Sequence, residues 1–273
     1  MKFITVSIVV LAAALGQRDP EGGLTEFPGL IEPYRVIRLS PAVDGVLEEV
    51  RVDRGDLIKQ NQILAQLESS VERATLTIAR SRADLVGEMQ ARKASLDFTE
   101  RKALSDENLR YRGIVSDLEA DQSLTEKLLA EAGILQTQET MKLAELEYER
   151  AHAALELRTI KSPITGVVVD RLLSPGELAT RQTQSVIFVL AQIDPLNVEI
   201  TLPIYMIGRI KVGDEAQVLP QEPIAGSHQA KVTVVDHVVE AESGTFRVRL
   251  QLPNPDYKLP AGIQCNVRFS DPN

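Results

Sequence analysis

The sequence predicts an α+β protein in which β modules predominate and a long α-helical coiled-coil hairpin is inserted into one of them. Two similar β-like segments lie far apart, at residues 40–57 and 162–178. The stretch between them lacks proline and is rich in residues that favour helix. Strands with alternating apolar residues follow the second segment. These observations divide the chain into residues 1–16, 17–35, 36–68, 69–157, 158–193 and 194–273.

Residues 1–16 resemble a secretory signal. Met1 and Lys2 precede an apolar run at residues 3–15, which ends in small residues. The run is shorter than the roughly 20 residues that usually span a membrane. We therefore expect a cleaved signal peptide or an N-terminal anchor, and in either case an exported chain. Residues 17–35 are expected to form a linker and a first strand.

The segments at 40–57 and 162–178 are two copies of one half-motif. Each begins with Ser-Pro and reaches a Gly-Val, and a second glycine, followed by an acid and a leucine, comes ten residues later. We interpret these glycines as structural turns, because glycine adopts positive φ without steric penalty. Each half is too small to bury a core, so the two halves should fold onto each other. Gly45 corresponds to Gly166, and Gly55 corresponds to Gly176. We expect the spatial partner of Gly45 to lie near Gly166.

Residues 69–157 are predicted to form a helical hairpin. Apolar or small residues recur at spacings of three and four on both arms, as in a two-stranded coiled coil. The chain should reverse near Gly113, where Ser116 offers an N-cap. Each arm of about 44 residues would reach roughly 65 Å. The predicted seam consists of Val71, Ala74, Ile78, Ser81 and Leu85 on the first arm, and Leu143, Leu146, Ala153 and Leu157 on the return.

Residues 194–273 are predicted to form a second β domain. Apolar residues alternate with polar ones in three segments, which is typical of half-buried strands. The inward-facing positions are Leu196, Val198, Ile200 and Leu202; Phe246, Val248, Leu250 and Leu252; and Ile263, Cys265, Val267 and Phe269.

Composition argues against several classes of function. A net charge of −9 and a pI near 5 oppose binding to nucleic acid. No HExxH, CxxC, GxSxG or P-loop motif occurs, and His152, His228 and His237 are dispersed. Cys265 is the only cysteine and is expected to be a buried apolar filler. We predict no catalytic, cofactor or metal site, and therefore no enzyme.

The segment SGTFRVRLQLPNPDYKLPAGIQCNVRF, at residues 243–269, resembles the barrel signature of the membrane fusion protein family, although Ala261 separates Pro260 from the turn glycine Gly262. The order of modules is also similar to that family, which comprises the periplasmic adaptors of tripartite efflux pumps of the resistance-nodulation-division type. The resemblance implies a lipoyl-like, or barrel-sandwich hybrid, domain split by the hairpin, followed by a β-barrel domain.

The resemblance also implies a function. Such a chain would lie in the periplasm, associated with the inner membrane. It would bridge an inner-membrane transporter to an outer-membrane channel of the TolC type for efflux of small molecules. Several copies would pack side by side as a homo-oligomer. At the hairpin tip, Leu109 and Ser116 fit the family's channel-contact spacing, whereas Ser105 stands where the family has arginine. Arg110 and Arg112, beside Gly113, are the candidate replacements.

Alternatives stay open at this point. The chain could serve an ABC-type exporter or a type I secretion system, or, remotely, be a lipoyl or biotinyl carrier. Because no membrane-proximal domain is evident before Asn273, docking on the transporter could use the barrel, the N-terminal segment or a reduced form of that domain. We expect movement at links near Leu67, Arg158 and Asp194, where few contacts should cross.

Overall fold

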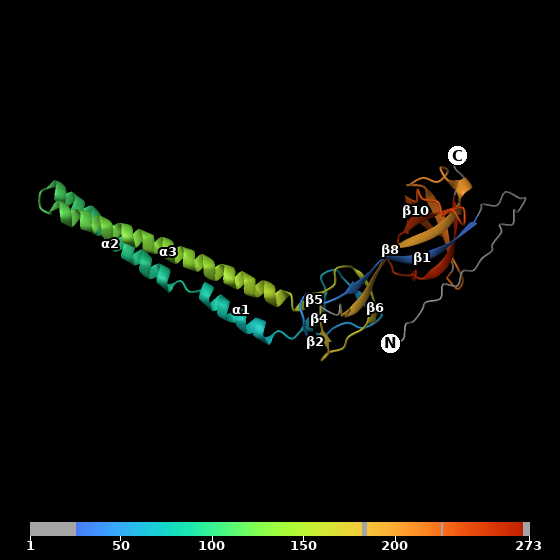
Figure 1. Ribbon diagram of the computed structural model, residues 1–273, viewed down its shortest axis with the longest axis horizontal. Helices are drawn as coiled ribbons and strands as arrows, with labels where there is room; N and C mark the ends of the chain where they lie inside the picture. The colour runs from blue at the N-terminus through green and yellow to red at the C-terminus, as the bar shows by residue number, and fades with distance from the viewer. Residues whose placement is uncertain (1–25, 182–184, 225, 270–273) are drawn as a thin grey trace, which may run out of the picture. The chain divides into compact units, whose positions relative to one another are not determined.

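The computed structural model describes residues 26–181, 185–224 and 226–269. The predicted signal or anchor at residues 1–16 lies outside the described residues. The chain divides into two compact units (Figure 1). One is Val36–Ala191; the other is Gln192–Asn273 together with the residues up to Arg35.

The unit that contains the C-terminal strands is a β-barrel. Its strands follow the order β1-β12-β9-β10-β11-β8, and a further pairing of β8 with β1 closes the circle. The predicted β-barrel is therefore confirmed. A 3-10 turn at Ile204–Met206 follows β8. The strands are β1 (Glu26–Leu39), β8 (Phe188–Pro203), β9 (Glu215–Pro220), β10 (His228–Val235), β11 (Thr245–Leu252) and β12 (Ile263–Phe269).

The predicted alternation of buried and exposed side chains holds in these strands. Phe246, Val248, Leu250 and Leu252 are buried in β11, while Arg247 between them is exposed. Burial of this kind on one face is what gives the barrel its aliphatic core. The core also takes in the side chains Leu196, Val198, Ile200, Leu202, Cys265 and Val267.

The two half-motifs fold onto each other in the first unit, as predicted. Val46 of β2 pairs with Leu178 of β7, and Leu57 of β3 pairs with Val167 of β6. One small sheet has the order β5-β4-β2-β7, and β3 and β6 continue the sheet of β8. The split lipoyl-like domain is thus confirmed. Its strands are β2 (Gly45–Val50), β3 (Leu57–Ile58), β4 (Ile63–Leu67), β5 (Thr159–Lys161), β6 (Gly166–Arg171) and β7 (Leu178–Ala179).

The second glycine of each half-motif lies in a hydrogen-bonded turn, and the two turns are equivalent. Gly55 and Gly176 have φ of +93° and +90°, which glycine alone adopts readily. The N–H of Gly55 donates to the carbonyl of Val168 at 2.8 Å, and that of Gly176 to the carbonyl of Leu47 at 2.7 Å. Each turn therefore binds the strand of the opposite half. Gly262 has φ of +88° and is the last residue of the connection before β12.

The first glycine of each half-motif is not a turn, so that interpretation is wrong. Gly45 and Gly166 are the first residues of β2 and β6. Gly45 pairs with Ala179 and Gly166 with Ile58, not with each other. Glycine at position 45 leaves room for Arg158, because a Cβ there would lie 2.7 Å from a guanidinium nitrogen of that side chain.

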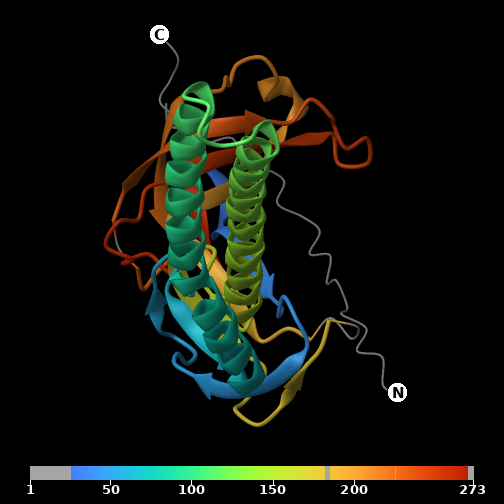
Figure 2. The same cartoon turned by 90° about the vertical axis from the view of Figure 1, so that its left-hand side faces the viewer.

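The predicted hairpin is present, with three helices instead of two. They are α1 (Ser70–Ala83), α2 (Gly87–Tyr111) and α3 (Asp117–Glu156). Figures 1 and 2 show α2 lying beside α3 along its length. The 40 residues of α3 form one helix about 60 Å long. The first arm, by contrast, is broken at residues 84–86.

The break coincides with a slip in the heptad. On the first arm the half-buried seam side chains include Ala83 before the break and Met89 after it, six residues apart instead of seven. A continuous helix would carry Gln90, which is exposed, into the seam. The N-terminus of α2 is also weakly stabilised, because Val86 offers no side-chain cap and Gly87 has a low helix propensity.

The predicted seam residues are wrong. Val71, Ile78 and Leu85 are 67%, 56% and 68% exposed, and Ala74 and Ser81 are also exposed. In the actual contact small side chains, which let two helices approach closely, alternate with larger ones. On α3 the contact positions still follow a strict heptad, offset from the prediction. They are Ala120, Ser123, Lys127, Ala130, Ile134, Thr137, Met141, Ala144, Tyr148, Ala151 and Leu155.

Candidate functional site: the hairpin tip and the hairpin base

The hairpin reverses over residues 112–116. Gly113 has φ of +70°, and the hydroxyl of Ser116 accepts a hydrogen bond from the N–H of Glu119 at 3.3 Å. This is the N-cap interaction that fixes the start of a helix. Asp117 and Glu119 in the first turn of α3 add favourable charge at that end. The turn is therefore set by local chemistry.

The candidate contact residues differ in their exposure to solvent and in their ion pairing. Leu109 and Arg110 are half-buried, whereas Arg112, Gly113 and Ser116 are exposed. The guanidinium of Arg110 donates to the carboxylate of Glu107 at 2.6 Å. The charge of Glu107 accordingly raises the pKa of Arg110. Within the described residues Arg112 forms no ion pair, so it is the arginine available to a partner.

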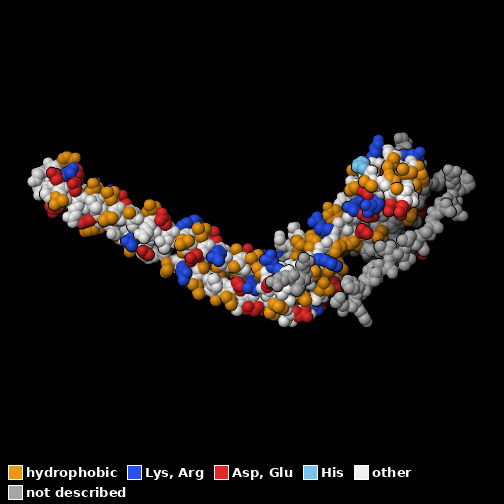
Figure 3. Space-filling view, viewed as in Figure 1, with side chains coloured by type: hydrophobic (Ala, Val, Ile, Leu, Met, Phe, Trp, Pro, Cys, Tyr) orange, Lys and Arg blue, Asp and Glu red, His pale blue; other side chains and the backbone are white. Residues whose placement is uncertain are grey.

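Three apolar side chains at the tip were not predicted. Tyr111 and Leu118 are each 80% exposed, and Ile114 is 67% exposed. Exposed apolar side chains gathered at one place mark interaction sites more often than scattered ones. A signal was available in the sequence, because these three lie within eight residues of one another and off the heptad. Together they give the tip an exposed apolar patch. Figure 3 shows hydrophobic side chains at the tip end of the rod beside acidic and basic ones, and further hydrophobic side chains along the rod.

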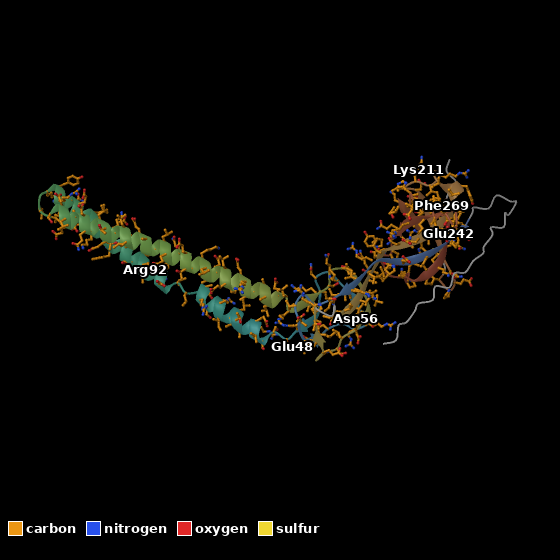
Figure 4. All side chains as sticks on the ribbon, in the orientation of Figure 1. Glu48, Asp56, Arg92, Lys211, Glu242 and Phe269 are labelled. Carbon is orange, nitrogen blue, oxygen red and sulfur yellow. The ribbon has the colours of Figure 1, made fainter. Side chains whose placement is uncertain are left out.

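Arg158 ties the base of the hairpin to the lipoyl-like domain. Its guanidinium donates to the carboxylate of Glu72 in α1 at 2.6 Å and to the carbonyl of Asp44 at 3.0 Å. Its own carbonyl accepts from the N–H of Leu67 at 2.8 Å. Beside it, the guanidinium of Arg73 in α1 forms an ion pair with the carboxylate of Glu48 in β2 at 3.3 Å (Glu48 is labelled in Figure 4). The expectation of few contacts at Leu67 and Arg158 is therefore wrong.

Replacing Arg158 with alanine is expected to loosen α1. Both Arg158 and Glu72 are largely buried, and a charge-assisted hydrogen bond contributes about 2 kcal/mol. Hydrogen exchange of the α1 amides should show that the free energy of opening this helix falls by about that amount. Arg54→Ala is the matched control, because no ion pair of Arg54 occurs in the described part of the chain. Equal exchange in both variants would contradict the assignment.

The link at Asp194 is also held by hydrogen bonds within its unit. The side-chain amide of Asn254 donates to the carbonyls of Ile193 at 3.0 Å and Leu259 at 2.9 Å. The N–H of Asn254 donates to the carboxylate of Asp194 at 2.9 Å. This asparagine opens the Asn-Pro-Asp sequence at residues 254–256, inside the segment that resembles the family's barrel signature, and its role is to fix the start of the barrel.

No three His, Cys, Asp or Glu side chains converge as metal ligands in the ranges that the structure describes. None of the described helices combines the length and the apolar character needed to cross a membrane. Burial raises the pKa of the Cys265 thiol to about 11.

Comparison with known proteins identifies both units. Residues 35–192 match the CzcB-like, barrel-sandwich hybrid domain, and residues 196–273 match the CusB-like, beta-barrel domain. The multidrug/solvent efflux pump periplasmic linker protein MepA of Pseudomonas putida is 25% identical over 259 residues. The multidrug efflux pump subunit AcrA of Escherichia coli (strain K12) is 23% identical over 263 residues. Each alignment covers 90% of this chain, which spans only 60% and 62% of those proteins.

A solved structure shows the same fold. MacA from Actinobacillus actinomycetemcomitans superimposes with a TM-score of 0.73 at 21% identity, covering 91% of this chain and 79% of that one. The matched domain of residues 35–192 takes up more than half of the 273 residues. The chain belongs to the membrane fusion proteins, the periplasmic adaptor family of efflux pumps, whose members are not enzymes.

Proposed function

We propose that this chain bridges an inner-membrane transporter and an outer-membrane channel of the TolC type for the efflux of small molecules. It would act in the periplasm as a homo-oligomer associated with the inner membrane. The observation that carries the proposal is the hairpin itself. A rod about 60 Å long ends in exposed Tyr111, Ile114 and Leu118, far from the domain that bears it.

The names of the relatives support the same function. MepA is a periplasmic linker of a multidrug and solvent efflux pump, and AcrA is a subunit of a multidrug efflux pump. Both are longer than this chain, so the way it meets a transporter is part of the proposal. The exposed Arg112 would donate hydrogen bonds to carbonyl or carboxylate groups of the channel.

The tip is tested by Leu118→Asp and Gly113→Pro in the full chain. An acid at Leu118 places charge in the apolar contact, and proline cannot adopt the positive φ of Gly113. Recruitment of the channel, measured by co-purification, should fall about tenfold or more, and export with it. Leu129→Asp, at a residue that is also exposed but lies eleven positions further along α3 than Leu118, is the control.

Unchanged recruitment by both tip variants would contradict the tip contact. The inner-membrane protein recovered in the same co-purification names the transporter class. A secondary transporter supports the proposal, and an ATPase would move the chain to the ABC-type exporters.

A further inference from the structure

Two connections and two strand termini meet at one end of the barrel. Residues 204–214 join β8 to β9, and residues 236–244 join β10 to β11. The N–H of Ile204 donates to the carbonyl of Gly244 at 3.0 Å, so the two connections are in contact. Strand β12 ends here and β1 begins here, because β12 runs antiparallel to both β9 and β1. We call this the entry end of the barrel.

The first connection, residues 204–214, closes the entry end and is apolar on both of its sides. Ile210 is buried in the barrel core, and Met206 packs against that core. Exposed apolar side chains gathered at one place mark a contact surface. Four such side chains on this connection form what we call the barrel-end patch: Ile204, Tyr205, Ile207 and Val212, which are 53%, 62%, 45% and 65% exposed.

The barrel-end patch has basic neighbours on its own connection. Arg209 and Lys211 are exposed, and neither forms an ion pair in the described part of the chain. The one acid of the connection is Asp214, whose carboxylate accepts a hydrogen bond from the N–H of Lys211 at 2.8 Å. Apolar and tyrosine side chains flanked by arginine and lysine suit the surface of a bilayer, because the cations stay at the headgroups while the apolar groups enter below them.

The second connection, residues 236–244, is unsuited to the same contact. It carries Asp236, Glu240 and Glu242, and Figure 4 labels Glu242 on this connection and Lys211 on the first. Carboxylates are repelled by phosphate groups and are costly to remove from water. The acids therefore leave the first connection as the part of the entry end that can meet a lipid surface.

The chain that precedes the barrel joins it at the same end. Residue 25 is bonded to Glu26, the first residue of β1. The apolar run at residues 3–15 is separated from Glu26 by residues 16–25, and ten residues span at most about 35 Å. Retained in the inner membrane as an anchor, the run would hold the entry end within that distance of the bilayer. The lipid surface is thus the partner that connectivity favours.

We propose that the barrel-end patch is a lipid-binding surface. Its four side chains enter the periplasmic leaflet of the inner membrane, and Arg209 and Lys211 donate to the phosphate groups of the lipids. This deepens the membrane association in the proposed function and rests on it. The contact gives the barrel unit an attachment of its own and fixes which end of the barrel faces the membrane.

Fluorescence on vesicles without any transporter tests the contact. Ile207→Cys in the full chain is labelled with nitrobenzoxadiazole and mixed with vesicles of phosphatidylethanolamine and phosphatidylglycerol that carry nitroxide-labelled acyl chains. We expect the emission to shift to shorter wavelength and to be quenched, because an interfacial side chain lies about 5–10 Å into the boundary between headgroups and acyl chains. Cys265 is buried, and the unsubstituted chain gives the background labelling.

Ser227→Cys is the matched control for the label position. Ser227 is exposed on the connection from β9 to β10, at the opposite end of the barrel, so its label should keep its emission. Adding Ile204→Asp to the Ile207→Cys chain should abolish the quenching, because it places a charge inside the contact. Ile204 is exposed, so this change should leave the barrel folded.

Four outcomes would overturn the proposal. The chain could fail to float with the vesicles, or float with no change at residue 207, which would assign attachment to another segment. Equal quenching at residues 207 and 227 would mean unspecific adsorption. A shift at residue 207 before vesicles are added would mean that protein covers the patch. None of these touches the bridging role, because recruitment of the channel through the hairpin tip is measured separately.

Discussion

Replacing Phe188 with alanine is expected to lower the free energy of unfolding of the lipoyl-like unit by about 4 kcal/mol. Phe188 is completely buried at the start of β8, where it packs in the core with Leu47, Leu67 and Ile187. Removing the ring loses its burial and leaves a cavity that strands from both half-motifs surround. Denaturant unfolding followed by circular dichroism would measure the loss.

Phe98→Ala is the matched control for Phe188→Ala. The ring of Phe98 is 63% exposed on α2, so its removal should change the free energy of unfolding by no more than about 0.5 kcal/mol. If the two variants lost similar stability, Phe188 would not be the centre of the core that joins the half-motifs.

Replacing Asn254 with alanine is expected to destabilise the barrel by about 3 kcal/mol. Asn254 is buried, and its side chain makes two hydrogen bonds as donor and accepts one from the N–H of Leu259 at 3.1 Å. Alanine leaves these backbone groups without partners away from water. Thermal unfolding should show the barrel transition moving to lower temperature.

Asn266→Ala controls for the loss of an amide. Asn266 is exposed on β12 and makes one hydrogen bond, to the carboxylate of Glu26 at 2.8 Å. We expect a change below about 1 kcal/mol. A loss as large as that of Asn254→Ala would mean that the buried network adds nothing beyond an ordinary surface hydrogen bond.

The fold was predictable because its signals are strong over short stretches. The repeat of Gly55 at Gly176 marks one turn used twice, and the alternation from Phe246 to Leu252 marks a strand with one buried face. Gly45 was misjudged because its constraint comes from Arg158, more than a hundred residues away. No local pattern contains that contact.

The hairpin seam was missed for a physical reason. The sequence places large apolar residues such as Val71, Ile78 and Leu85 in a clean heptad, and the usual expectation buries them. The structure uses the smaller Ala79 and Ala151 for the internal contact. Periodicity predicts that a stripe has a partner, but it does not say whether the partner belongs to the same chain.

The tip was predicted in part. Gly113 and Ser116 predict the reversal of the chain, because glycine favours a turn and serine favours an N-cap. In the structure Gly113 has positive φ and Ser116 caps α3. The exposure of Tyr111 and Leu118 depends on how the two arms rotate about each other at their ends. That rotation follows from the seam, which the heptad of large residues obscured.

The interruption at residues 84–86 gives the rod a mechanical weak point. Two helices share a sideways load along most of the hairpin, but at this height only α3 is continuous. The stiffness of a beam falls steeply where its cross-section narrows, so a force applied at the tip would flex the rod there. Its free end would swing in the plane of the two arms while the clamped base stayed still.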